Sequence, residues 1–369
     1  MPRLVLVGGG HSHALVLDAL ARESLPGLEV HLVVDRPSAV YSGMVPGLIA
    51  EQYRRDDVEI DVERLARRAG VQLHLQPMVG IDARARAIAL PRDRSLTYDV
   101  ASLNIGSAVA GLELEGVRRH TLPTRPMPEL MAGIEAATDR AQKLERAFHS
   151  VVVGGGAGGV ELAFCLDARL AADSAVHTTL VTDAKRLLPG FGTAFARQID
   201  AEAKRREIHI VTERRAQRVD ARAVYFDDGS ELEHDLVVWA TGAVGPPAFA
   251  NTTLPLDPKG FVYVDECLRV DGYDSLFAVG DCATLRAYPR TPKAGVYAVR
   301  QAPVLLHNLR AWQAKRKLQT YRPQGDFLRL LNLGDGRAVG GKWTYATAGR
   351  SMMRLKDRID RRFIARFRG

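Results

Sequence analysis

The sequence is poor in cysteine. Its 369 residues include three cysteines, Cys165, Cys267 and Cys282, and no two of them are spaced as CxxC or CxxxxC. This excludes a disulfide framework, a structural zinc site of paired cysteines and a thioredoxin-like redox pair. We therefore expect no metal site and a reducing, cytoplasmic environment.

Long apolar segments are also missing. No run approaches the roughly 20 residues that a bilayer-spanning helix needs, and residues 4–7 resemble a strand rather than part of a signal peptide. We expect the chain not to cross a membrane by itself. With 46% hydrophobic and 25% charged residues, the composition is that of an ordinary globular protein of two or three domains.

Positive charge is concentrated at one end of the chain. The formal net charge is +8, and residues 350–369 hold eight Lys and Arg residues against two Asp residues. Six of the eight excess charges therefore lie in this tail. The rest of the chain is close to neutral, and the sequence contains no nucleic-acid-binding motif.

A glycine-rich turn follows the first predicted strand. Residues 4–7 are apolar, Gly8 and Gly10 come next, and a helical pattern begins after them. This strand, turn and helix are typical of the opening of a Rossmann unit, in which the helix N-terminus faces a pyrophosphate. The third glycine position holds His13, which must either widen the approach of helix to strand or turn outward near the phosphates.

A second glycine-rich turn repeats the pattern after a Val-rich strand at residues 150–153. Here Gly154, Gly156 and Gly159 complete the GxGxxG fingerprint in its required context. The second predicted strand of each unit ends in an acid, Asp35 or Asp183, where a Rossmann fold accepts hydrogen bonds from an adenosine ribose. A solvated strand end is the alternative for Asp35. The two Rossmann units together predict that the protein binds two dinucleotides.

In chain order, the segments GGGHSH, SGMVPG, GGGAGGVELA, WATGA, FAVGDCA and GVYAVRQA resemble the pyridine nucleotide-disulfide oxidoreductase superfamily. The narrower resemblance is to its type II NADH dehydrogenase branch, in particular to relatives associated with selenide, water dikinase. It implies an α/β fold of two Rossmann-like, three-layer FAD/NAD(P)-binding domains and a short C-terminal region. The expected parts are residues 1–122 (FAD, first part), 123–255 (NAD(P)H), 256–311 (FAD, second part) and 312–369 (C-terminal region).

The resemblance assigns the first unit and the FAVGD segment to FAD, and the middle unit to NAD(P)H. The cofactor-binding residues expected from it are Gly8, Gly10, His11, Asp35, Ser42, Pro46, Gly106, Gly154, Gly156, Gly159, Asp183, Gly242, Gly280 and Asp281. Asp281 is also compatible with a simple helix N-cap, and the SGMVPG segment with a surface loop. Asp183 favours NADH because a carboxylate repels a 2′-phosphate, but the neighbouring Lys185 and Arg186 leave NADPH open.

Four residues are candidates for a catalytic role. Glu161 falls where the branch carries a glutamate near the meeting point of flavin and nicotinamide, although a polar residue in the first turn of a helix is the simpler alternative. Tyr297 and Gln301 are expected to line the acceptor pocket, and Lys293 to stabilise anionic reduced flavin. The lack of a CxxxxC pair argues against disulfide-reductase chemistry, so a separate acceptor must take the electrons.

The basic tail, residues 350–369, suggests which molecule accepts the electrons. Met352, Leu355, Ile359, Phe363 and Phe367 form a helical stripe, with Lys356 and Arg366 at its edges, where they could snorkel. A basic amphipathic helix is typical of an anionic membrane surface, where a quinone is found. Docking on the protein's own body is the alternative.

The leading hypothesis is therefore an FAD enzyme that passes electrons from NAD(P)H to a quinone, peripheral on the inner face of the cell membrane. A soluble reductase of a redox protein or selenium compound is the second hypothesis. A non-catalytic flavin-binding redox sensor, functionally linked to selenide, water dikinase, is the third.

Overall fold

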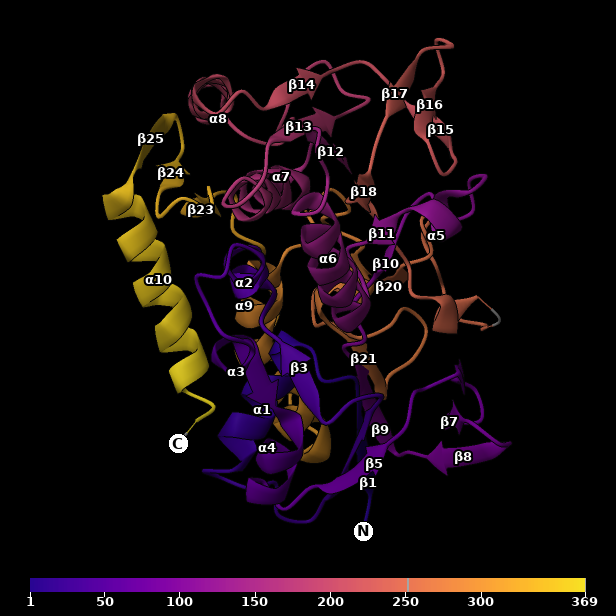
Figure 1. Ribbon diagram of the computed structural model, residues 1–369. Coiled ribbons are helices and arrows are strands. Elements are labelled where there is room, and N and C mark those ends of the chain that lie inside the picture. Colours follow the sequence, from indigo (N-terminus) through magenta and orange to yellow (C-terminus); the bar gives the residue numbers. More distant parts are fainter. Residues whose placement is uncertain (251, 369) are drawn as a thin grey trace.

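Two parallel five-stranded sheets form the centres of the molecule's two lobes (Figure 1). The structure is a computed structural model, and it describes residues 1–250 and 252–368. The chain builds most of the first sheet, crosses to the second and then returns to add one more strand to the first. This arrangement confirms the predicted α/β class with two Rossmann-like units.

The first sheet has the strand order β21-β9-β1-β2-β5. Its central strand is fully buried over Leu4–Val7, as expected of a parallel strand covered on both faces. Its members are β1 (Arg3–Val7), β2 (Glu29–Val34), β5 (Gln72–Leu75), β9 (Val100–Leu103) and β21 (Leu276–Ala278). Helices α1 (His11–Leu20), α4 (Val62–Arg68) and α9 (Gly295–Gln313) pack beside this sheet, and α1 contacts both of the others.

The second sheet has the order β11-β18-β12-β13-β14. Its strands are β11 (Leu122–Pro123), β12 (Phe148–Val153), β13 (Val176–Val181), β14 (His209–Val211) and β18 (Leu236–Trp239). Helices α6 (Met127–Ala141), α7 (Ala157–Leu170) and α8 (Thr193–Arg205) belong to this lobe. The carboxyl ends of β1 and β12 carry the two glycine loops, so both loops lie where parallel sheets commonly bind ligands.

Smaller elements join and flank the two sheets. They are β3 (Ser38–Val40) with β4 (Glu59–Asp61), β6 (Gly80–Asp82) with β7 (Ala87–Leu90) and β8 (Arg94–Thr97), β10 (Ala108–Val109) with β19 (Ala243–Val244), β15 (Ala216–Val219) with β16 (Ala223–Phe226) and β17 (Glu231–Glu233), and β20 (Val262–Val264) with β22 (Ala283–Leu285). Short helices are α2 (Val45–Ile49), α3 (Arg55–Val58), α5 (Val117–His120), η1 (Ser42–Met44), η2 (Pro247–Phe249) and η3 (Gly280–Cys282).

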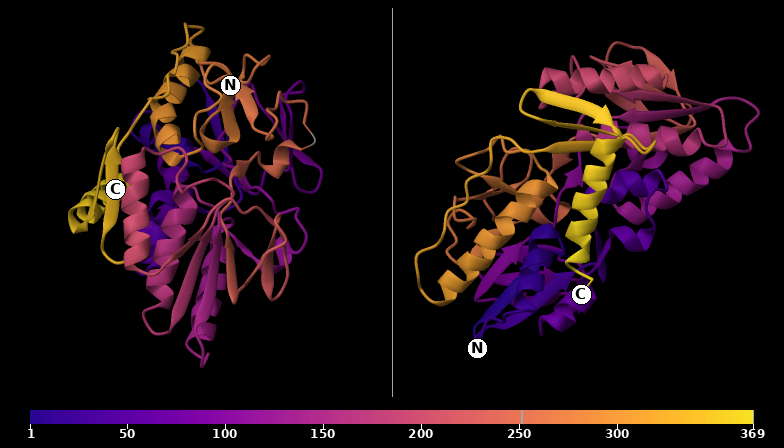
Figure 2. Two further views of the ribbon diagram at one scale, coloured as in Figure 1. Left: turned by 90° about the horizontal axis from the view of Figure 1, so that it is seen from above. Right: turned by 90° about the vertical axis from the view of Figure 1, so that its left-hand side faces the viewer.

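The C-terminal region spans both lobes. Strands β23 (Arg329–Asn332), β24 (Ala338–Lys342) and β25 (Tyr345–Gly349) form an antiparallel sheet that contacts α7 and α8. Helix α10 (Arg350–Ala365) then runs along the side of the molecule and reaches α3 of the first lobe (Figures 1 and 2). Among the described residues, no helix is both long and apolar enough to cross a bilayer.

Candidate active site

The first glycine loop leaves no room for side chains. Gly8 has φ +95°, and a Cβ there would lie 2.4 Å from the carbonyl oxygen of Asn104. Gly10 is the N-cap of α1, and a Cβ there would lie 2.4 Å from Oδ1 of the same asparagine. The loop therefore packs tightly against the end of β9 and presents its backbone to the space above the sheet.

Asn104 joins three segments beneath this loop. Its Oδ1 accepts the backbone N–H groups of Ser12 (3.1 Å) and His13 (3.2 Å), and its Nδ2 donates to the carbonyl of Val279 (3.0 Å). The sequence reasoning missed this residue. An amide directly after the predicted strand, two residues before Gly106, is the pattern that could have found it.

His13 turns inward rather than toward the phosphates. Its ring is fully buried, Nδ1 donates to the carbonyl of Gly8 (2.8 Å), and Nε2 lies 2.8 Å from Oγ of Ser102. Burial lowers the pKa of His13 to about 4, so the ring is neutral at physiological pH. The histidine thus replaces the expected small residue by tying the glycine loop to β9.

A cavity of about 220 Å³ opens above the first loop. Five of the predicted cofactor residues line it, namely Gly10, His11, Ser42, Gly106 and Asp281. The Nε2 atom of His11 is buried without a hydrogen-bond partner among the described residues. A glycine cradle with an unpartnered polar atom is the arrangement that a bound dinucleotide would complete.

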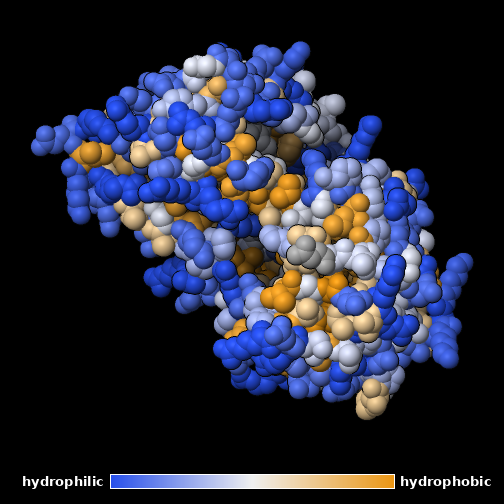
Figure 3. Space-filling model, turned by 90° about the vertical axis from the view of Figure 1, so that its right-hand side faces the viewer, coloured by the Kyte–Doolittle hydropathy of each residue, from blue (hydrophilic) through white to orange (hydrophobic). Residues whose placement is uncertain are grey.

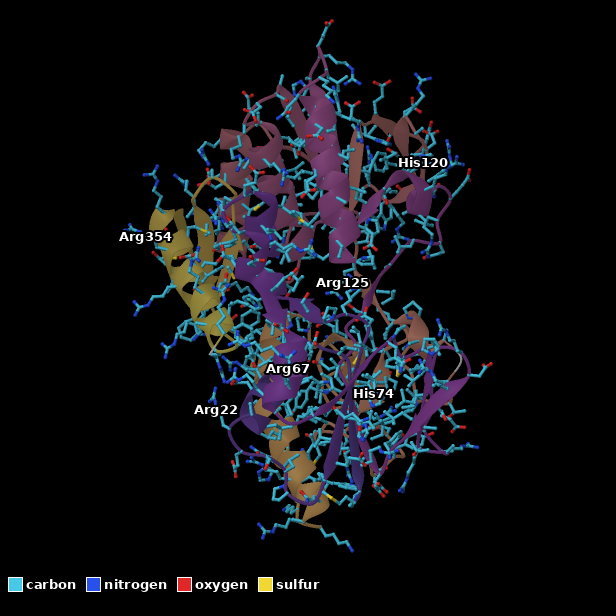
Figure 4. The ribbon with its side chains drawn as sticks, turned by 60° about the horizontal axis from the view of Figure 1, so that its bottom comes forward. Arg22, Arg67, His74, His120, Arg125 and Arg354 are labelled. Atoms are coloured by element: carbon cyan, nitrogen blue, oxygen red, sulfur yellow. The ribbon has the colours of Figure 1, made fainter. Side chains whose placement is uncertain are left out.

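Arg125 also lines this cavity and was not predicted. Its guanidinium donates to the carbonyl (2.9 Å) and to Oγ (2.7 Å) of Ser107, and lies 3.4 Å from the Asp281 carboxylate. It projects from the connection between the lobes, as Figure 4 shows. The surface between the lobes is hollowed and lined largely by hydrophobic residues (Figure 3). The Arg125 guanidinium suits a pyrophosphate. The sequence did not indicate this role, because Arg125 lies in a proline-rich linker with no motif around it.

Three predicted residues lie around the cavity rather than on it. Pro46 is buried in the first turn of α2, and its neighbour Val45 lines the cavity instead. Asp35 is exposed just after β2, with its carboxylate 3.5 Å from the guanidinium of Arg36. Gly280 lies at the start of η3, and its backbone N–H donates to Oε1 of Gln301 (2.6 Å).

The second glycine loop is equally tight. Gly154 has φ +136°, and a Cβ there would lie 2.2 Å from the carbonyl oxygen of Ala240. A Cβ on Gly159 would lie 1.8 Å from the Gly154 carbonyl oxygen, whereas Gly156 and Gly242 face open space among the described residues. Helix α7 begins directly after Gly156, so its N-terminus faces that space.

Asp183 is exposed beyond β13. Its carboxylate lies 3.7 Å from the guanidinium of Arg215. Arg186, one of the two cations that left NADPH open, donates to the carbonyls of Leu188 (3.1 Å) and Phe191 (2.9 Å). These backbone contacts occupy the arginine that could otherwise fold back over a 2′-phosphate.

Lys293, Tyr297 and Gln301 lie together beside a second, smaller cavity of about 20 Å³, which also touches Asp281. The Lys293 ammonium donates to the Ala283 carbonyl and to Oγ1 of Thr284 (2.9 Å). It also lies 4.0 Å from the centre of the Phe261 ring. Burial lowers the pKa of Lys293. All three predicted residues are thus near the FAVGD segment but outside the larger cavity.

Glu161 lies in the first turns of α7. Its Oε1 accepts the backbone N–H of Asn332 (2.8 Å) on β23. Burial raises the pKa of Glu161 to about 7, against the opposing effect of the Lys356 ammonium. The carboxyl group can therefore gain or lose a proton near neutral pH.

The tail helix does not present the predicted stripe as one face. Phe367 is buried, and the Phe363 ring stacks on Tyr41 with centroids 4.6 Å apart, while Leu355 and Ile359 are exposed. Lys356 does not snorkel at an edge as expected. It is buried, and its ammonium donates to the Gly43 carbonyl (2.7 Å). The stripe prediction was wrong in this respect, since buried polar contacts rather than hydrophobicity alone set the rotation of α10.

Arg366, the other expected edge residue, is exposed at the edge of the docked face. Its guanidinium lies 3.7 Å from the buried carboxylate of Asp18 on α1. Helix α10 therefore docks on the body of the protein through one face and leaves the other exposed. Docking on the protein's own body, the alternative for this helix, thus describes the inner face of α10. The membrane hypothesis concerns only its outer, exposed face.

Two glycine loops at the ends of two parallel sheets, a cavity at the first of them, and free, unpaired cysteines define a dinucleotide-dependent oxidoreductase without a redox disulfide. The model of the family described as pyridine nucleotide-disulphide oxidoreductase matches residues 2–302, and the chain belongs to this family. It is thus an FAD-dependent oxidoreductase that uses a reduced pyridine nucleotide.

Similar proteins are consistent with this family. The chain is 26% identical over 303 residues to human ferroptosis suppressor protein 1, covering 77% of this chain and 74% of that protein. It is 25% identical over 354 residues to the demethylphylloquinone reductase NdbB of Synechocystis, covering 92% of this chain and 87% of that protein.

Solved structures share the fold. The sulfide:quinone oxidoreductase of Aquifex aeolicus superposes with a TM-score of 0.84 at 17% identity, covering all of this chain and 92% of that one. NDH2 of Plasmodium falciparum, solved in complex with NADH, gives a TM-score of 0.79 at 13% identity and covers 99% of this chain and 97% of that one.

Proposed function

We propose that this protein oxidises NADH at bound FAD and passes the electrons to a quinone at a membrane surface. The observation that carries the proposal is the cavity at the first glycine loop, lined by Gly10, His11 and Asp281, in a chain of this family. Relatives named as a demethylphylloquinone reductase and as NAD(P)H-ubiquinone oxidoreductases support the choice of acceptor.

Each glycine loop has a distinct task in this proposal. The first loop, with Asp281 and Arg125, holds FAD, which supplies the chemistry of accepting hydride and releasing electrons. The second loop holds NADH, and Asp183 accepts hydrogen bonds from its adenosine ribose. The Asp183 carboxylate supports NADH over NADPH, and the backbone contacts of Arg186 engage one of the two cations that follow it.

The protein must also manage protons. The balanced reaction is NADH + H⁺ + quinone → NAD⁺ + quinol, because hydride carries one proton equivalent and the quinone needs two. One proton per turnover therefore comes from solvent, and Glu161 is the group that we assign to deliver it. Gln301 and Tyr297 are proposed to line the path of the acceptor, and Lys293 to add positive charge near the flavin.

The outer face of α10 is the proposed membrane contact. We use this term for Arg350, Arg354, Leu355, Arg358, Ile359 and Arg362, all exposed. The four arginines are spaced four residues apart, and Figure 4 shows Arg354 pointing away from the body. Trp343 and Tyr345, 72% and 71% exposed on the adjoining β24–β25 hairpin, add interfacial aromatics. This combination favours a peripheral location on the inner face of the cell membrane.

Acceptor turnover tests the proposal against its alternatives. Purified enzyme with NADH is assayed with a short-chain ubiquinone or menaquinone, with selenite and with small redox proteins. The proposal predicts that the quinone is reduced fastest. Faster reduction of selenite or of a redox protein would favour the soluble reductase, and a link to selenide, water dikinase. Absence of turnover with every acceptor would favour the non-catalytic flavin sensor.

A further inference from the structure

A buried ion pair from α10 lies next to the proposed active site. Lys356 and Asp360 are each 5% exposed, and their Nζ and Oδ2 atoms lie 2.9 Å apart. The Lys356 ammonium also donates to the Gly43 carbonyl (2.7 Å), and the Tyr41 hydroxyl donates to Oδ1 of Asp360 (3.1 Å). The pair is thus fixed from two sides by the loop that carries Ser42 into the cavity.

This pair is unlike the other ion pairs of the helix. Arg361 and Asp357, also four residues apart on α10, lie at the surface with a 2.8 Å contact. Burying two charges costs free energy that their attraction seldom exceeds, so an apolar pair would serve packing at least as well. Residues 303–369, which include the pair, lie outside the segment that the family model matches.

We infer that Asp360 is a positioning residue, whose carboxylate pairs with the Lys356 ammonium and offsets its charge, so that Glu161 retains the proton that quinone reduction takes up. The inference rests on the proposed function. In this arrangement α10 contributes to the site itself, in addition to any contact that its outer face makes with a membrane.

The charges around Glu161 determine in which direction its pKa should shift when either member of the pair is removed. Glu161 is bound to β23 through the Asn332 N–H, and α10, which carries the pair, packs on β23. In this arrangement the Lys356 ammonium favours the Glu161 carboxylate, whereas the Asp360 carboxylate favours its protonated form. The Tyr41 hydroxyl and the Cys165 thiol also face this carboxyl, but both remain neutral because burial raises the pKa of each. Removing Lys356 or Asp360 should therefore shift the titration of Glu161 in opposite directions.

The experiment compares two acceptors over about pH 5.5 to 9. Ferricyanide takes electrons without protons, whereas a short-chain quinone takes both. We expect D360N to lower quinone kcat at pH 7.5 about tenfold and to move the alkaline limb of its pH profile down by about one unit. K356M should move the same limb up, and both variants should leave ferricyanide turnover within about twofold of wild type.

Conservative and matched variants complete the test. D360E should restore most of the quinone activity, and D357N, which removes the surface carboxylate on the same helix, should leave the profile unchanged. Flavin content and melting temperature are measured for every variant. Shifts of both limbs in the same direction, equal losses with both acceptors, or flavin loss in D360N and D360E alike would overturn the inference, because each indicates that the pair only anchors α10.

Failure of the proposed function has a different outcome. If wild-type enzyme oxidises NADH with ferricyanide but reduces no quinone, the proposed acceptor is wrong and the inference falls with it. If wild type reduces quinone and D360N matches it at every pH, the proposed function stands and only the role of Asp360 is rejected.

Discussion

The ring of Phe363, on the last helix, stacks on the ring of Tyr41 with their centroids 4.6 Å apart. The Tyr41 ring also meets His11 edge-on at 5.4 Å, and His11 lines the cofactor cavity. A continuous aromatic contact thus joins α10 to the first glycine loop. Deleting the tail would disturb the site as well as any membrane contact, so point substitutions are the cleaner way to separate the two.

Substitutions on the outer face should weaken membrane binding without affecting chemistry. Replacing Arg354 and Arg358 with Gln should cost about 1 kcal/mol each, or about 30-fold in affinity for vesicles containing phosphatidylglycerol. Co-sedimentation at low and high salt measures this, with turnover on ferricyanide as the activity control. Arg67, exposed on α4, provides the matched R67Q variant. Equal binding by the double variant and by R67Q would reject the outer face as the contact.

Asn104 should be required for retention of FAD. N104L leaves the backbone N–H groups of Ser12 and His13 without their acceptor, which costs about 1–3 kcal/mol for each buried group, and removes one of the donors to the Val279 carbonyl. N104D keeps the acceptor for Ser12 and His13 but loses the donor to Val279, so it should be intermediate. The ratio of flavin to protein after gel filtration gives the order wild type, N104D, N104L. Full flavin content in N104L would contradict this role.

His13 should make stability depend on pH. The ring is neutral in both states above pH 6.5. As pH falls below 6.5 the unfolded chain binds a proton that the native ring, with a pKa of about 4, does not accept. Stability is therefore lost as pH falls, by about 2 kcal/mol at pH 5 for this residue.

Unfolding in urea at pH 7.5 and at pH 5 measures this loss. The H13N variant should be less stable than wild type at pH 7.5, yet lose about 2 kcal/mol less between the two pH values. Since other titrating groups are shared, they cancel in the difference. Identical losses in the two proteins would show that His13 titrates normally in the native state.

Asp183 and Asp35 should have separable effects. D183A should raise the KM for NADH about tenfold, since one hydrogen bond to a charged group is lost, and should raise the KM for NADPH less. D35A should instead lower flavin retention and leave the KM for NADH unchanged. Steady-state kinetics with both nucleotides, on samples with measured flavin content, separate the two. A reversal of these effects would exchange the assignment of the two loops.

The fold and the two loops were predictable because their causes are local. Apolar strands followed by Gly8 or Gly154, and an acid at the end of the next strand, are read directly from neighbouring residues. Asn104, Arg125 and Asp360 were not found, because each has a partner far away in sequence: Ser12 for Asn104, Asp281 for Arg125 and Tyr41 for Asp360. The rotation of α10 was mispredicted for the same reason. The partner of Lys356 at Gly43 is 313 residues away, and no periodicity within the helix reveals it.

The central claim is that electrons pass from NADH through FAD to a quinone. The most direct test is the anaerobic absorbance spectrum of the purified protein, titrated first with NADH and then with a short-chain quinone. The account predicts that one equivalent of NADH bleaches the flavin band and that one equivalent of quinone restores it. A flavin that NADH does not bleach, or that stays bleached after quinone is added, would contradict it.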